Sequence, residues 1–139
     1  MITFLTENVE MPEIQKTPVR AWIINVAKEY GKRVGEIAYI FCDDAKILEV
    51  NKQYLGHDYY TDVITFDYSK KKLISGDIFV SLDTVKSNSK KYNQPFLTEL
   101  HRVIIHGVLH LCGINDKGPG EREVMEAAED KALSMFSIE

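Results

Sequence analysis

The chain has few cysteines, no long apolar run and no excess of positive charge. Its two cysteines, Cys42 and Cys112, are too few for a disulfide framework and fit a protein of the reducing cytosol. The first residues lack a basic segment followed by a long apolar stretch, so we expect no signal peptide, and no later segment is long enough to cross a membrane. The sequence therefore predicts a cytoplasmic protein that does not bind a membrane.

The formal net charge of −4 at neutral pH is a mild argument against nucleic-acid binding, because basic side chains usually drive contact with phosphate. The charge is unevenly distributed, however, and much of the acid lies between residues 121 and 130. Basic residues gather in two clusters, Lys70, Lys71 and Lys72 in the first and Lys86, Lys90 and Lys91 in the second. The first cluster fits an ordinary solvated hairpin tip, and a basic rim around a functional cleft is the alternative.

The most informative segment is HGVLHLCGIND, at residues 106–116. Residues four apart lie one turn apart on the same face of an α-helix, so His106 and His110 can reach one metal ion. Gly113 is the residue type that ends a helix with a positive φ. A chain that reverses there can return Asp116 over the histidines as a third ligand, and this set leaves one coordination position open, as in a catalytic zinc site.

A pair of histidines at this spacing is common and on its own usually means nothing. Here, however, the helix is apolar on nearly all sides, as is typical of a helix buried in the core. A buried histidine needs a partner for each ring nitrogen, and a metal ion would satisfy both side chains. Glu99 lies about two turns before His106 on the same face, where it could hold a histidine Nδ1–H or act as a general base.

The length of 139 residues and the 45% hydrophobic content predict a single domain over residues 1–139. Alternating and β-rich segments predict four strands, at 2–5, 36–42, 63–68 and 74–82. Apolar spacing and helix-capping residues predict five helices, at 18–30, 43–54, 83–92, 95–112 and 121–136. The inner stripe expected for the last helix consists of Val124, Ala127, Ala128, Lys131, Ala132 and Met135. We therefore expect an α+β fold with a mixed four-stranded sheet, about five helices and the zincin-like metal-binding helix in the core.

The segment HGVLHLCG at 106–113, with Glu99 upstream, resembles the YbeY family of bacterial rRNA maturation factors and metal-dependent endoribonucleases. Two further segments are similar to family motifs in the same order and spacing, TDVITF at 61–66 and GDI at 76–78, so the resemblance covers essentially the whole chain. The resemblance implies a single-strand-specific endoribonuclease that acts near the 3′ end of 16S rRNA. It implies rRNA and the small ribosomal subunit as partners, and no DNA is expected.

Two positions depart from the family pattern. Asp116 stands where the family usually carries a third histidine; aspartate is an acceptable zinc ligand, but it lowers the charge of the metal site by one unit. Leu55 stands where the family typically carries an arginine, a residue suited to phosphate binding. Lys52, Lys71 and Arg102 are the alternatives for that role.

Three functional hypotheses remain. In the first, His106, His110 and Asp116 hold Zn²⁺, or another divalent ion such as nickel, manganese or iron, and the lysine clusters contact RNA. The sequence leaves open whether water or the ribose 2′-hydroxyl attacks the phosphorus. The second hypothesis is a non-catalytic ribosome assembly factor with a structural metal site, which the leucine at position 55 favours. The third, a metallopeptidase, lacks its general base, because Gly107 stands where zinc peptidases carry a glutamate.

Overall fold

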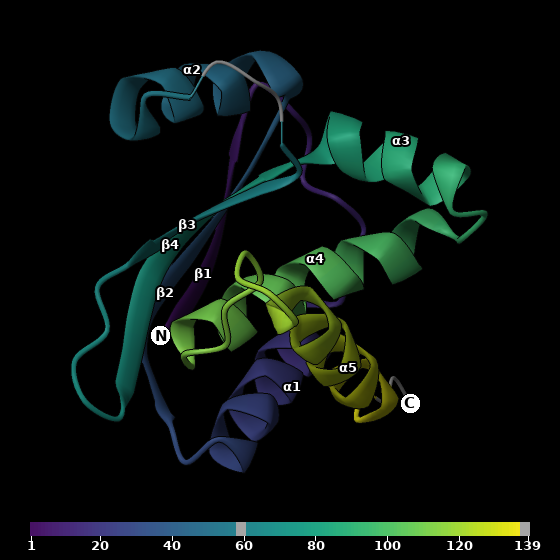
Figure 1. Ribbon diagram of the computed structural model, residues 1–139. Helices are drawn as coiled ribbons and strands as arrows, with labels where there is room; N and C mark the ends of the chain where they lie inside the picture. The colour runs from purple at the N-terminus through teal and green to yellow at the C-terminus, as the bar shows by residue number, and fades with distance from the viewer. Residues whose placement is uncertain (58–60, 137–139) are drawn as a thin grey trace.

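The computed structural model describes residues 1–57 and 61–136 of the chain, and it confirms the α+β fold (Figure 1). Each predicted element is present, with ends shifted by no more than a few residues. The strands are β1 (Ile2–Glu7), β2 (Arg33–Cys42), β3 (Val63–Asp67) and β4 (Leu73–Ser81). The helices are α1 (Lys16–Glu29), α2 (Asp44–Leu55), α3 (Leu82–Lys91), α4 (Phe96–Leu111) and α5 (Glu121–Ser134). Within the described residues, no helix is both long and apolar enough to span a bilayer.

The four strands form one mixed sheet in the order β1-β2-β4-β3. The β1–β2 and β2–β4 pairs are parallel, and β3 runs antiparallel to β4. The antiparallel pair is the predicted hairpin, and the lysine-rich segment forms its turn, where Lys70 pairs with Leu73 and Lys71 has a φ of +56°. The first lysine cluster therefore lies at a hairpin tip, as one of the two sequence interpretations predicts.

Different helices cover the two faces of the sheet, since side chains alternate between faces along each strand. Helices α1, α4 and α5 lie on one face, where they share a large apolar core with strand residues such as Ile37, Tyr39 and Ile78 (Figure 1). A smaller cluster on the other face joins Ile47 of α2 to Ile64 of β3. The histidine helix α4 thus lies in the main core, as predicted.

Two buried hydrogen bonds fix the helices around α4. The phenol of Tyr39, on β2, donates to the carbonyl oxygen of Ile104 in α4 at 2.7 Å. The indole of Trp22, on α1, donates to the carbonyl oxygen of Ala132 in α5 at 2.7 Å. Burial raises the pKa of Tyr39 well above its usual value, so its hydroxyl keeps the proton that it donates. These bonds hold α4 against the sheet and α5 against α1, and together they set the relative position of the two helices that build the site.

Gly107 lies where α4 passes closest to β4. A Cβ atom at this position would lie 2.8 Å from Cδ1 and 3.0 Å from Cγ2 of Ile78, which is fully buried. Glycine therefore allows the helix to approach the strand. The same contact leaves no room for a glutamate at the position where a metallopeptidase carries its general base, which argues further against that hypothesis.

Replacing Gly107 with alanine is expected to lower the free energy of unfolding by about 1 kcal/mol. Overpacking a tight core costs roughly 1–3 kcal/mol, and the better helix propensity of alanine offsets up to about 1 kcal/mol of that cost. Chemical denaturation checks the change. In an Ile78→Val background, which lacks the clashing Cδ1 atom, the same substitution should cost less. An equal cost in both backgrounds would show that the contact with Ile78 is not the cause.

Candidate active site

An open cavity of about 680 Å³ runs along α4, bordered by the start of β3, the end of α3, and α5. Its charged lining is mostly acidic, with six carboxylates and two arginines: Asp62, Glu99, Asp116, Glu126, Glu129, Asp130, Arg102 and Arg122. Such a cavity attracts cations, and an anionic substrate would need positive charge there to offset the repulsion. The sequence predicts that the loop at 56–61 and the hairpin of the third and fourth strands border the cleft. The start of this hairpin, at Asp62 and Val63, does line the cavity, whereas residues 58–60 of the loop lie outside the described residues.

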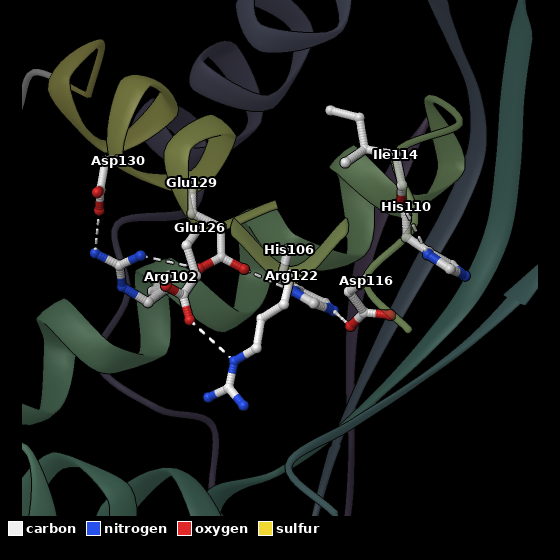
Figure 2. A network of polar contacts seen from close by, with 9 residues as sticks. All are labelled: Arg102, His106, His110, Ile114, Asp116, Arg122, Glu126, Glu129 and Asp130. Atoms are coloured by element: carbon white, nitrogen blue, oxygen red, sulfur yellow. Dashed lines mark hydrogen bonds and ion pairs between the residues drawn. The ribbon is translucent and has the colours of Figure 1, made fainter. Parts of the chain in front are cut away.

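His106 lies between two carboxylates (Figure 2). Its Nδ1 is 2.7 Å from Oε2 of Glu129, on α5, and its Nε2 is 3.3 Å from Oδ2 of Asp116. Because a carboxylate accepts hydrogen bonds, Nδ1 donates its hydrogen to Glu129, and Nε2 is the nitrogen left to face Asp116. The predicted meeting of His106 and Asp116 is therefore present in the structure.

The charges around His106 favour a cation at Nε2. Burial by itself would lower the pKa of His106, but the hydrogen bond and charge of Glu129, together with the charges of Asp116 and Asp62, outweigh burial. The pKa is therefore raised above the ordinary value for histidine. A proton at Nε2 would balance the negative charge of these carboxylates. A metal ion bound by Nε2 and the Asp116 carboxylate would balance it as well.

The turn after α4 returns Asp116 to His106. Gly113 has a φ of +102°, and the helix ends with paired bonds from Gly113 N to the His110 oxygen and from Ile114 N to the Leu109 oxygen. This is a Schellman motif, which needs a left-handed residue just past the helix end. The glycine prediction is confirmed, and the motif explains why a residue ten positions beyond His106 lies beside it.

His110 has a different partner. Its Nδ1 lies 3.2 Å from the carbonyl oxygen of Ile114, so Nδ1 donates and the Nε2 lone pair is free in the neutral ring. Figure 2 shows the His110 ring standing apart from the pair formed by His106 and Asp116. The structure thus brings together two of the predicted ligands, His106 and Asp116. The other predicted ligand, His110, lies about one helical turn away.

The donor chemistry of these side chains fits a divalent metal. Metal-binding histidines usually donate one ring N–H to a carboxylate or carbonyl and bind the ion through the other nitrogen, which is the arrangement of both His106 and His110. Outside residues 58–60 and 137–139, which the structure does not describe, no three His, Cys, Asp or Glu side chains are close enough to hold an ion.

Glu129, which the sequence analysis missed, takes the position expected for Glu99. The sequence predicted that Glu99 holds the Nδ1–H of a histidine, but the structure gives this contact to Glu129. Glu129 also accepts a hydrogen bond from Nη1 of Arg102 at 2.9 Å, and Nη2 of Arg102 lies 2.6 Å from Asp130. The buried Glu129 therefore joins α4 and α5 and sets the orientation of the His106 ring.

The predicted inner stripe of α5 was wrong in part: Ala132 is buried and Ala128 and Met135 pack against the core, but the other three residues of the stripe are exposed. Buried residues of this helix are Met125, Glu129 and Ala132, whereas Val124 is 59% exposed. The prediction placed Val124, Ala127 and Lys131 inside, although the structure leaves them exposed. A glutamate usually faces solvent, but a carboxylate with two partners, such as that of Glu129, can be buried. The burial of Glu129 is indicated in the sequence by its spacing, four residues after Met125 and three before Ala132, which places the three side chains on one face of the helix.

Glu99 and Asp62 line the cavity, and the pKa of each carboxyl group is raised above its ordinary value. Burial raises the pKa of Glu99, and the charge of Asp62 raises it further. Burial likewise raises the pKa of Asp62, although the charge of His106 opposes this effect. Raised pKa values in a cleft are typical of groups that transfer protons, so the general-base hypothesis for Glu99 remains open.

The cationic residues suggested by the sequence contribute less to the cavity than expected. The lysines at 70, 71, 72, 86, 90 and 91 are all described, and none of them lines it. Of the alternatives for the missing arginine, Arg102 does line the cavity, but two carboxylates already hold it. Arg122 also lines the cavity, and its Nε donates to Glu126 at 3.1 Å. Arg122 is therefore the cavity cation better placed to meet a phosphate.

The buried histidine helix, its carboxylate and carbonyl partners and the open acidic cavity form a candidate hydrolase site. The chain belongs to the YbeY family, since the family model described as endoribonuclease YbeY matches residues 2–137. It is 68% identical over 138 residues to the endoribonuclease YbeY of Phocaeicola vulgatus, covering 99% of this chain and 100% of the relative.

Two further relatives agree. The endoribonuclease YbeY of Bacteroides fragilis is 66% identical over 134 residues, covering 96% of each chain. A Thermotoga maritima protein, whose structure was determined in solution, superposes with a TM-score of 0.68 at 28% identity, over 98% of this chain and 89% of that one. The expected family is therefore confirmed, and with it the endoribonuclease class of enzyme.

Proposed function

We propose that the chain is a metal-dependent endoribonuclease that cleaves single-stranded rRNA near the 3′ end of the small-subunit RNA. The observation that carries the proposal is His106, held by Glu129 at Nδ1 and facing Asp116 at Nε2 in an open acidic cavity. The substrate, the association with the small ribosomal subunit and the cytoplasmic location come from the family. The free thiols of Cys42 and Cys112 are compatible with that location.

In this proposal His106, His110 and Asp116 would hold the ion, and Zn²⁺ is the metal that suits imidazole and carboxylate ligands. A bound divalent ion polarises a phosphate oxygen and lowers the pKa of water. Glu129 holds the His106 ring in the tautomer that leaves Nε2 free. Arg102 in turn holds Glu129 at 2.9 Å.

The remaining cavity residues would bind the phosphate and move protons. Arg122 offers a planar cation that can contact phosphate oxygens in pairs. Glu99 is the carboxyl group that we assign to proton transfer, since its raised pKa lets it exchange a proton closer to neutral pH than an ordinary glutamate does. The lysines of the β3–β4 turn and of α3 remain candidates for contacts with RNA farther along the strand.

The proposal is tested by measuring metal content and RNA cleavage on the same samples of the protein and of a His106→Ala/His110→Ala variant. We expect about one equivalent of zinc and cleavage of a single-stranded RNA in the protein, with both lost in the variant. A metal bound without metal-dependent cleavage would instead support the non-catalytic assembly factor. The absence of any bound metal would overturn the proposed metal site.

A further inference from the structure

Tyr92 forms part of the same cavity wall as His106, at the end of α3. Its ring is 53% exposed. The residue ends the helix, and its backbone N–H donates to the oxygen of Asn88 at 2.9 Å. This exposed ring, on a backbone anchored to the helix end, is an apolar surface beside a polar cavity.

The groups around Tyr92 suit a nucleotide. Nζ of Lys91 lies over one face of the ring, 5.5 Å from its centre, which leaves the opposite face of the ring for a base. Asn88 and Gln94 line the cavity on either side of Tyr92 in the chain. Each side-chain amide offers both a donor and an acceptor, and neither is engaged with another side chain in the part of the molecule that the structure describes. Such amides can pair with the edge of a base.

We propose that this end of the cavity is a nucleobase subsite, in which Tyr92 stacks on an unpaired base while Asn88 and Gln94 face its edge. Arg122, on the α5 side of the cavity, binds a phosphate of the same strand. Proteins commonly recognise single-stranded RNA by stacking splayed bases on aromatic rings and pairing with their edges. The subsite rests on the proposed function, and it supplies a physical reason for single-strand specificity, because a base in a duplex cannot present its face to Tyr92.

The test measures the binding of a fluorescein-labelled oligouridine ten nucleotides long by fluorescence anisotropy, with the full-length protein. A denaturing gel confirms that the RNA stays intact. The Tyr92→Ala variant should bind roughly 5- to 150-fold more weakly, as expected for the loss of one stacked base. Tyr92→Phe, which keeps the ring, should bind like the unaltered protein. Tyr68→Ala removes a tyrosine of similar exposure (58%) that does not line the cavity, and it should have no effect.

An abasic oligomer of ribose phosphate separates base contacts from phosphate contacts. The Tyr92→Ala substitution should have no effect on the binding of this oligomer, since no base is left to stack. Arg122→Gln should weaken the binding of both oligomers by a similar factor, because arginine contacts phosphate. Equal effects of Tyr92→Ala on both oligomers, or no effect on either, would overturn the subsite. Neither result bears on metal-dependent cleavage, so the proposed function would stand or fall separately.

Discussion

Replacing Glu129 with alanine is expected to lower metal affinity and RNA cleavage by roughly 10- to 100-fold, the usual cost of losing the partner of a metal-binding histidine. The substitution removes the acceptor 2.7 Å from Nδ1 of His106, so the ring can rotate and Nε2 no longer points at Asp116. It also leaves Arg102 with one partner instead of two. Breaking a buried ion pair costs about 3–5 kcal/mol, and since the Arg102 side chain is one-third exposed, we expect the low end of that range.

Two measurements separate these effects. Zinc titration, at a temperature where the variant is folded, measures the metal affinity, and chemical denaturation measures the stability. Asp130→Asn is the matched control, because Asp130 pairs with the same Arg102 but is mostly exposed and does not touch His106. An exposed pair contributes at most about 1 kcal/mol, so this variant should keep its metal affinity. If Glu129→Ala bound zinc as tightly as Asp130→Asn, the orienting role of Glu129 would be wrong.

The sequence was sufficient to predict the elements and their order, because the signals involved are local. The spacing of His106 and His110, the glycine that ends their helix and the apolar character of α4 each depend on neighbouring residues, and the structure confirms the helix and its turn. The hairpin at the lysine cluster is equally local. Such features follow from periodicity and turn chemistry, without knowledge of the tertiary contacts.

The wall of the cavity could not be predicted in the same way. Glu129 and Arg122 come from α5, which lies beside α4 because the core packs the two helices together and the Trp22 hydrogen bond holds α5 against α1. A polar residue is ordinarily assigned to the solvent side of a helix, and its burial depends on partners that are distant in sequence. Tyr92 gave no signal either, because an isolated tyrosine at the end of a polar helix is unremarkable until its place in the cavity is known.

Asp116, the proposed third ligand, lies beside His106 as the sequence predicts, and its removal should separate folding from function. The Asp116→Ala variant is expected to fold normally. Asp116 lies in a partly exposed turn, and among the described residues its carboxylate is paired with His106. Its metal affinity and RNA cleavage should fall by more than the roughly 10- to 100-fold expected for a residue that only supports a ligand. Circular dichroism, zinc titration and the cleavage assay measure the three quantities.

Asp116→His is the matched control, because it replaces the carboxylate with the family's usual ligand at this position. An imidazole can bind the ion in its place, so this variant should retain zinc and cleavage when the alanine variant has lost both. The alternative in which the metal is structural predicts a different result. A metal that held the turn between α4 and α5 in place would leave the Asp116→Ala variant less folded by circular dichroism, and removal of zinc from the unaltered protein would have the same effect. A folded alanine variant that still binds zinc as tightly as the unaltered protein would remove Asp116 from the ligand set.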